Sequence, residues 1–108
     1  MFVGVCRLSL IVPETASLKG KRSVVRRIID RTRAKFNVAI AEVGANDDPR
    51  QGIIGFAVIG NESGFVDAMM SSIVSFIEGT GLAFIGRRET EVTTYGDELY
   101  DGVRYRGR

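Results

Sequence analysis

The sequence predicts an α+β fold of four strands and two helices, because four segments rich in β-forming residues are interleaved with two segments of helical periodicity. The chain has 108 residues, which is enough for one domain with a hydrophobic core and too few for two. Hydrophobic residues make up 44% of it and charged residues 26%, as in average folded proteins. We expect one domain over residues 1–95 and a polar tail over residues 96–108.

The first part of the chain predicts a strand and then a helix. Apolar side chains fall at alternate positions of residues 2–12, which is typical of a strand with one buried face. Pro13 ends this strand because proline cannot donate to the ladder, and Ser17 can cap the helix that follows. The buried face of that helix is marked by side chains at spacings of three, four and seven: Leu18, Val25, Ile28, Ile29, Thr32 and Phe36.

Residues 38–44 and 52–60 predict a β-hairpin. Both are rich in β-branched and small apolar residues, and the seven residues between them include Asn, Asp and Pro, which favour loops. Asp47 and Asp48 lie in this loop. We expect them to form a turn, because a metal site would need more oxygen ligands than the loop supplies.

A second helix and a fourth strand complete the pattern. Asn61 or Ser63 can cap a helix that runs to about Glu78, followed by a Gly-Thr-Gly turn and a last strand over residues 82–94. The order is β-α-β-β-α-β, which is that of the ferredoxin-like fold. In that fold both helices pack on one face of an antiparallel sheet.

The other face of the predicted sheet has no cover within the chain. Where its residues are apolar, such a face is a candidate for dimerisation or ligand contact. A homodimer is therefore a candidate assembly. On the first strand this face carries Val3, Val5, Arg7, Ser9 and Ile11.

The residue types present argue against an enzyme. The chain has no histidine, which removes the commonest general base and zinc ligand. Cys6 is the only cysteine and falls on the core side of the first strand, so we expect no disulfide and a buried thiol. Gly52, Gly55 and Gly60 lie within a strand, where they indicate bulges or close packing and not a dinucleotide-binding loop. We expect no catalytic residues, no cofactor and no metal.

The chain also lacks the signals of a membrane or exported protein. Its apolar runs are shorter than the eighteen or so residues that span a bilayer. Arg7 interrupts the N-terminal segment where a signal peptide would be apolar. We expect a cytoplasmic protein without a membrane partner.

The first helix concentrates the positive charge of the chain. Residues 17–36 contain eight basic residues and one acid, Asp30, which gives plus seven against minus five for the remaining residues. Like charges one turn apart destabilise a helix, and a bound anion would relieve that repulsion. One stripe of helical spacing has Arg27, Arg31 and Lys35, a second has Lys19, Arg26 and Arg33, and Lys21 and Arg22 complete the set.

Two interpretations of this charge remain open. A surface whose charges are nearly all positive is typical of contact with a phosphate backbone, which makes RNA or a ribosomal particle the candidate partner. Alternatively, the helix face is solvated and partly balanced by Glu42, Glu89 and Glu91 on the sheet. Arg87 and Arg88 on the last strand either extend an anion surface or keep a sheet edge soluble.

The RNA-recognition motif shares the predicted element order, but its stacking aromatics are not in place. Gly55-Phe56-Ala57 is suggestive of it. However, Ile54 stands where a basic residue is expected, and Val58 replaces the second aromatic. We expect Phe56 to be a core residue.

Two stretches resemble the YlxP-like proteins, an uncharacterised bacterial family. They are V-G-V-x-R-L-x-L-x-V-P-E-x-x-S-L-K-x-K-R-x-V-V over residues 3–25 and F-N-V-A-I-A-E-V-G over residues 36–44. The resemblance covers residues 3 to about 94 and implies a ferredoxin-like fold and a gene neighbourhood among transcription and translation factors, such as the ribosome-binding factor A gene. It implies no catalytic residues, and it leaves open the role of the motif residues Ser17, Leu18, Lys19, Lys21 and Arg22.

One position departs from the family pattern. Members often carry Glu after Ser-Leu-Lys, where it closes a capping box onto the serine, whereas this chain has Gly20. We expect a looser helix start.

The leading hypothesis is a non-enzymatic binding module whose first helix contacts RNA or a ribosomal particle. The alternative is a homo-oligomeric scaffold or a small-ligand regulatory domain that uses the uncovered sheet face.

Overall fold

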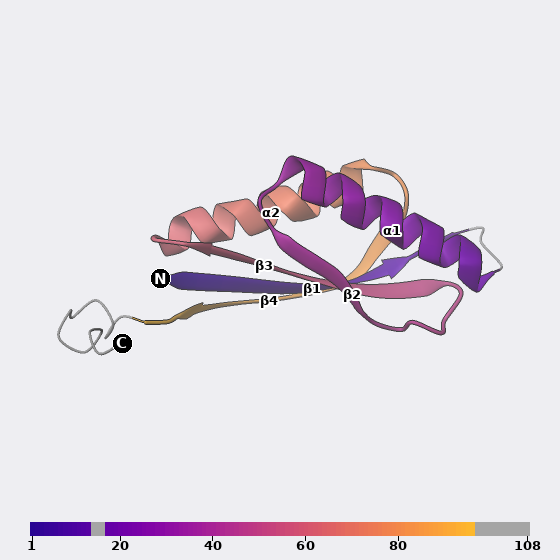
Figure 1. Ribbon diagram of the computed structural model, residues 1–108, viewed down its shortest axis with the longest axis horizontal. Helices are drawn as coiled ribbons and strands as arrows, with labels where there is room; N and C mark the ends of the chain where they lie inside the picture. Colours follow the sequence, from indigo (N-terminus) through magenta and orange to yellow (C-terminus); the bar gives the residue numbers. More distant parts are fainter. Residues whose placement is uncertain (14–16, 97–108) are drawn as a thin grey trace, which may run out of the picture.

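A computed structural model describes residues 1–13 and 17–96 and contains the six predicted elements in the predicted order (Figure 1). The fold class predicted from the sequence is confirmed, and each boundary lies within two residues of its expected position. The rest of the predicted tail, residues 97–108, lies outside the described residues. The elements are β1 (Phe2–Ile11), α1 (Leu18–Lys35), β2 (Ala39–Gly44), β3 (Gln51–Gly60), α2 (Ser63–Gly79) and β4 (Phe84–Thr94).

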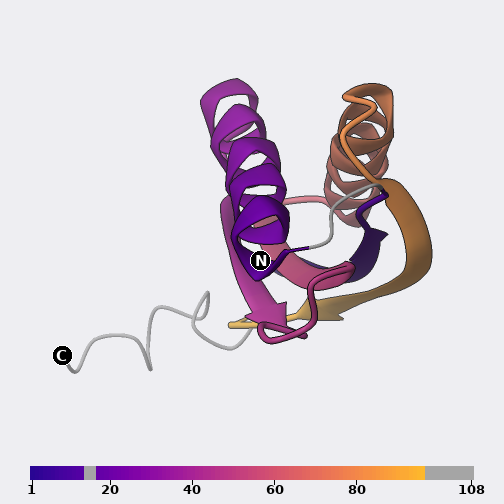
Figure 2. The ribbon, with the colours of Figure 1, turned by 90° about the vertical axis from the view of Figure 1, so that its right-hand side faces the viewer.

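The four strands form one antiparallel sheet in the order β2-β3-β1-β4, with β1 and β3 at its centre. The hairpin predicted from residues 38–60 is the β2–β3 pair. Figure 2 shows α1 and α2 standing side by side on the same face of a curved sheet, with no element of the described chain on the opposite face. We call that opposite face the open face.

The core lies between the sheet and the two helices. Leu8 and Leu10 of β1 are fully buried, as are Ile28 of α1 and Ile73 of α2. These side chains come from alternate strand positions and from one stripe of each helix, so the predicted periodicities are confirmed. Phe56 is 3% exposed and belongs to this core, as predicted.

Cys6 also belongs to the core, at 3% exposure. Burial raises the pKa of its thiol, and the nearby Arg88 offsets only part of that effect. Since the thiolate is the nucleophile, Cys6 has the properties of a structural residue and not of a reactive one.

The two helices begin in different ways. The Ser17 Oγ accepts a hydrogen bond of 3.0 Å from the Gly20 N–H, which confirms the predicted cap of α1. The predicted cap of α2 by Asn61 or Ser63 is wrong, because its N-cap is Glu62 and no side chain caps it. Packing explains the difference: Val66, in the first turn of α2, is fully buried against the sheet. Burial of that apolar face stabilises a helix start without a cap.

Two of the three glycines predicted within β3 lie where a helix approaches the sheet closely. A Cβ on Gly60 would lie 2.8 Å from the Phe65 ring, and one on Gly52 would lie 3.0 Å from Val25 Cγ2. The pairing shifts instead in β2 between Glu42 and Gly44, and in β4 opposite Ser9. Close packing against a helix therefore accounts for Gly52 and Gly60. Gly55 lies opposite Arg7 on the open face, where a Cβ would lie 3.4 Å from Val43.

Gly4 tests this packing, because a Cβ there would lie 2.5 Å from Val66 Cγ1. We expect Gly4→Ala to lower the free energy of unfolding by about 1 to 3 kcal/mol, since extra volume strains a filled core. Gly64→Ala is the control: no atom lies within 4 Å of its Cβ, and alanine favours the helix, so the free energy should rise by up to about 1 kcal/mol. Urea unfolding measures the free energy of unfolding of both variants. Changes of the same sign would contradict the close packing inferred at Gly4.

Candidate nucleic-acid interface

Helix α1 presents its basic side chains away from the sheet, because its apolar stripe packs over β2 and β3 and against α2. The structure divides the eight predicted site residues into two groups. Three of them have local partners. The other five are exposed, and their side chains form no hydrogen bond or ion pair with any described residue: Lys19, Arg22, Arg26, Arg27 and Arg31.

Lys21 does not belong to the exposed surface, and this part of the prediction is wrong. Its side chain is fully buried, and its ammonium donates to the Glu42 carboxylate at 3.0 Å and to the backbone oxygens of Ala45 and Asn46 at 3.0 and 3.4 Å. The sequence contained the signal, because Lys21 stands three residues after Leu18 and seven before Ile28, on the apolar stripe. Lys21 therefore joins α1 to the β2–β3 hairpin.

Arg33 and Lys35 also have structural partners at the end of α1. The Arg33 guanidinium donates to the Ile40 carbonyl at 2.8 Å, which ties the helix to β2. The Lys35 ammonium lies 5.6 Å from the centre of the Phe76 ring of α2, within reach of a cation–π interaction. Both cations also lie near the negative end of the helix dipole.

These two contacts orient the two predicted stripes. Residues seven apart lie on nearly the same side of a helix, so Lys19 and Arg26 share the side of Arg33, toward β2. Residues four and eight apart share a side as well, which places Arg27 and Arg31 with Lys35, toward α2. The stripes flank an exposed ridge that includes Asp30, whose carboxylate lies 3.9 Å from Arg33. We call the five unpartnered cations on these flanks the α1 basic surface.

The acids expected to balance this surface are not beside it. Glu42 is paired with the buried Lys21. Glu89 and Glu91 stand opposite Arg7 and Val5 of β1, and so lie on the open face, away from the helices. The charge of the α1 basic surface is therefore not neutralised from the sheet.

The adjacent arginines of β4 point to opposite faces of the sheet. Arg88 pairs in register with the buried Leu8, on the helix side, whereas the Arg87 side chain approaches Glu89 of the open face at 3.5 Å. The two arginines therefore do not extend the α1 basic surface together.

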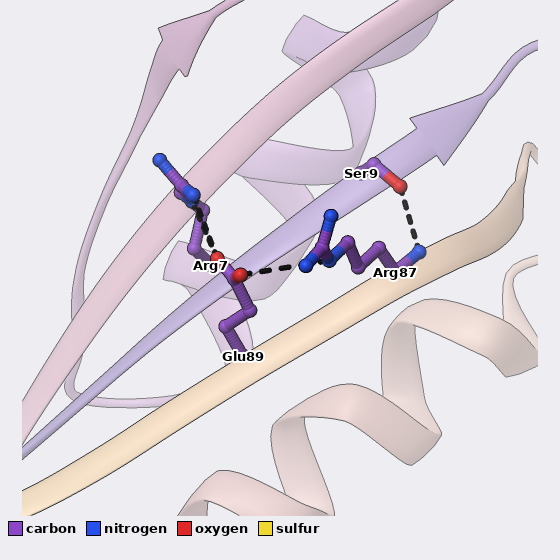
Figure 3. A network of polar contacts seen from close by, with 4 residues as sticks. All are labelled: Arg7, Ser9, Arg87 and Glu89. Carbon is purple, nitrogen blue, oxygen red and sulfur yellow. Dashed lines mark hydrogen bonds and ion pairs between the residues drawn. The ribbon is translucent and has the colours of Figure 1, made fainter.

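The open face carries a polar network along β1 and β4 (Figure 3). Arg7 donates to Glu89 Oε1 through Nε at 3.0 Å and Nη2 at 2.7 Å. The Arg87 backbone N–H donates to Ser9 Oγ at 2.7 Å, at the position where the strand pairing shifts. The hydrogen bonds from Arg7 lower the pKa of Glu89, and the charges of Arg7 and Arg87 add to this effect.

The remaining sequence predictions concern metal, membrane and loop roles. Asp48 Oδ1 accepts a hydrogen bond of 2.9 Å from the Arg50 N–H, which confirms its turn role. Among residues 1–13 and 17–96, no group of three or more Cys, Asp or Glu side chains is placed to hold a metal ion. No helix in these ranges is both long and apolar enough to cross a membrane.

The fold and this surface define the protein as a ferredoxin-like domain with a basic first helix. A designed protein with a ferredoxin fold is similar in structure, with a TM-score of 0.54 at 18% identity over 90% of this chain and 89% of that chain, which supports the fold alone. Residues 3–89 match the family described as "Protein of unknown function (DUF503)". The chain is also 30% identical to the "Uncharacterized protein YlxP" of Bacillus subtilis (strain 168), over 70% of this chain and 83% of that protein.

The chain therefore belongs to this family of unknown function, and the YlxP-like resemblance is confirmed. Within the shared Ser-Leu-Lys-x-Lys-Arg pattern, Ser17 caps α1 and Lys21 holds the hairpin, so these two motif residues have structural roles. Lys19 and Arg22 of the same pattern are exposed on the α1 basic surface.

Loss of the Lys21 ammonium should be costly, because Glu42 and two backbone oxygens lose their shared donor. We expect Lys21→Met to lower the free energy of unfolding by about 1 to 3 kcal/mol. Arg26→Met on the exposed side of the same helix is the control and should change it by less than about 0.5 kcal/mol. Equal effects of the two changes in urea unfolding would show that the buried contacts contribute nothing.

The Arg7–Glu89 contact should be visible in a pH titration. Because the pKa of Glu89 is lowered in the folded chain, its contribution to stability is present above the ordinary Glu pKa and is lost as the pH falls through the lowered value. We expect Arg7→Gln to raise the pKa of Glu89 toward its ordinary range, as followed by NMR of the Glu89 carboxyl carbon. Arg88→Gln, on the other face of β4, should have no such effect. A Glu89 pKa unchanged by Arg7→Gln would refute the assignment.

Proposed function

We propose that this protein is a non-enzymatic, cytoplasmic binding module that contacts RNA, free or in a ribosomal particle, through the α1 basic surface. The observation that carries the proposal is the presence of five exposed cations on one helix without an acidic partner among the described residues. Such cations repel one another in the free protein, and a phosphate backbone would relieve that repulsion.

The arrangement of the surface supports backbone contact and not reading of bases. Its cations lie on two flanks of one helix, and no aromatic side chain of α1 stands among them. Phe56 is in the core, so the sheet does not offer the stacking surface of an RNA-recognition motif. Binding of this kind is set by charge and shape and has little dependence on base sequence.

The proposal predicts a steep dependence of affinity on salt. If all five cations contact phosphates, the logarithm of the binding constant should fall with the logarithm of salt concentration with a slope of about −3.5 to −4.5. Fluorescence anisotropy with a structured RNA and co-sedimentation with ribosomal subunits, each over a series of salt concentrations, measure this slope. Affinity that does not change with salt would contradict the proposal.

Charge reversal on α1 provides the direct test. Changing Arg26, Arg27 and Arg31 to Glu should abolish binding in the same assays, since it replaces three contacts by repulsion. The control changes Arg50, Arg87 and Arg88 to Glu, which alters the net charge by the same amount at exposed positions outside α1. It should reduce affinity far less. If both triple variants lose affinity equally, net charge and not the α1 basic surface explains the binding, and the proposal fails.

A further inference from the structure

We infer that the open face is the interface between two copies of this chain, which pack sheet against sheet in a two-fold symmetric dimer with the helices outside. This inference is independent of the proposed RNA contact. It rests on the apolar content, shape, charge and area of the open face.

Large exposed apolar side chains concentrate on this face. Ile59 is 62% exposed and Phe84 66%, and the central β1 residue Val5 is 41% exposed. Strand register places all of them on the side of Arg7, away from the helices. Ile59 lies opposite Val3 and Phe84 lies opposite Ile11, so the apolar side chains are distributed along the whole face. Exposed apolar side chains that gather on one face indicate an interaction site. Of the eight large hydrophobic side chains that are exposed in the described chain, five belong to the open face: Val5, Ile11, Val43, Ile59 and Phe84.

The shape of the face suits an apolar partner with projecting side chains. Small residues of β2 and β3, among them Ala41, Gly55 and Ala57, line a hollow of about 410 Å³. Val43 and Ile59 project beside it, at 56% and 62% exposure. In a two-fold symmetric contact, each copy can place such projecting side chains against the small residues of the other, because residue i meets residue j and j meets i.

The charges of the face favour a second copy over a strongly charged partner. Its ionic side chains are Arg7 and Arg87 against Glu89 and Glu91, which sum to zero. They gather along β1 and the edge strand β4, whereas β2 and β3 contribute mostly apolar side chains. The face is therefore divided into a charged half over the central strand β1 and the edge strand β4 and an apolar half over β2 and β3. A surface with equal numbers of both charges can be complementary to itself, and it offers no net attraction to a polyanion.

The area of the face is of the order that a stable dimer requires. The strands have 10, 6, 10 and 11 residues. At a spacing of about 4.8 Å they cover about 600 Å² in projection, and the accessible surface of their side chains exceeds this projection. A standard interface buries about 800 Å² on each partner. Two such sheets would pack about 10 Å apart and form a four-layered particle, with one α1 basic surface on each outer side.

Measurement of the mass in solution tests the inference. Sedimentation equilibrium of the full chain from micromolar to millimolar concentration should give twice the chain mass of 11.8 kDa. Ile59→Glu and Val5→Glu should each weaken the dimer by at least about a hundredfold, because each would bury an unpaired charge in the interface. Phe65→Glu is the matched control, since Phe65 is also apolar and 52% exposed but lies on α2, and this change should leave the dimer intact.

The substituted chains must be folded for the result to count, and Ile59→Glu is the milder change because that side chain is already mostly exposed. Circular dichroism and the urea midpoint establish folding. A parent chain that is monomeric over the whole concentration range would overturn the inference. So would a dimer that survives a folded Ile59→Glu variant, or a parent that dimerises only after residues 97–108 are removed, since the last result would assign the face to the chain's own tail.

Discussion

The handedness of the two crossover connections determines which face of the sheet the helices cover and which face stays exposed. β1 and β2 are parallel with β3 between them, and β3 and β4 are parallel with β1 between them. The β3–β4 connection starts from a strand that is antiparallel to β1. It also crosses the sheet in the direction opposite to that of the β1–β2 connection. Two right-handed crossovers related in this way must lie on the same face. One face of the sheet is therefore buried, and the other is left without cover by any described element (Figure 2).

Covering the β2–β3 side of the sheet with α1 also explains why one lysine of the helix is structural. The buried stripe of α1 meets the hairpin loop near its first turns, where Ala45 and Asn46 turn their carbonyl oxygens inward and Glu42 supplies a carboxylate. Ala45 adopts a left-handed conformation with φ of 57°, which is uncommon for a residue other than glycine. Three oxygens replace the hydration of the ammonium, so the hairpin loop and the helix are stabilised by one ion.

The sequence was sufficient for the fold because each element has a strong period and the turn residues stand between the elements. The six elements and most of the core follow from that pattern. The pattern was less informative about the ends of the elements and about the residues of the candidate nucleic-acid interface. Tertiary packing determines the start of α2 at Glu62 and the shifts of strand pairing. No local sequence motif indicates either feature. The residue type of Lys21 predicts an exposed side chain, whereas its position on the apolar stripe predicts a buried one. Its partner Glu42 can be identified only once the hairpin is placed beside the helix.

The two surfaces that remain differ in chemistry and lie on opposite sides of the domain. The α1 basic surface carries five cations and faces away from the sheet, whereas the ionic groups of the open face sum to zero. A polyanion is therefore attracted to the outer side of α1 and gains nothing at the open face. An apolar partner has the opposite preference. Since the core separates the two surfaces, a charge change on α1 and an apolar change on the sheet should act independently, as substitutions without shared contacts generally do.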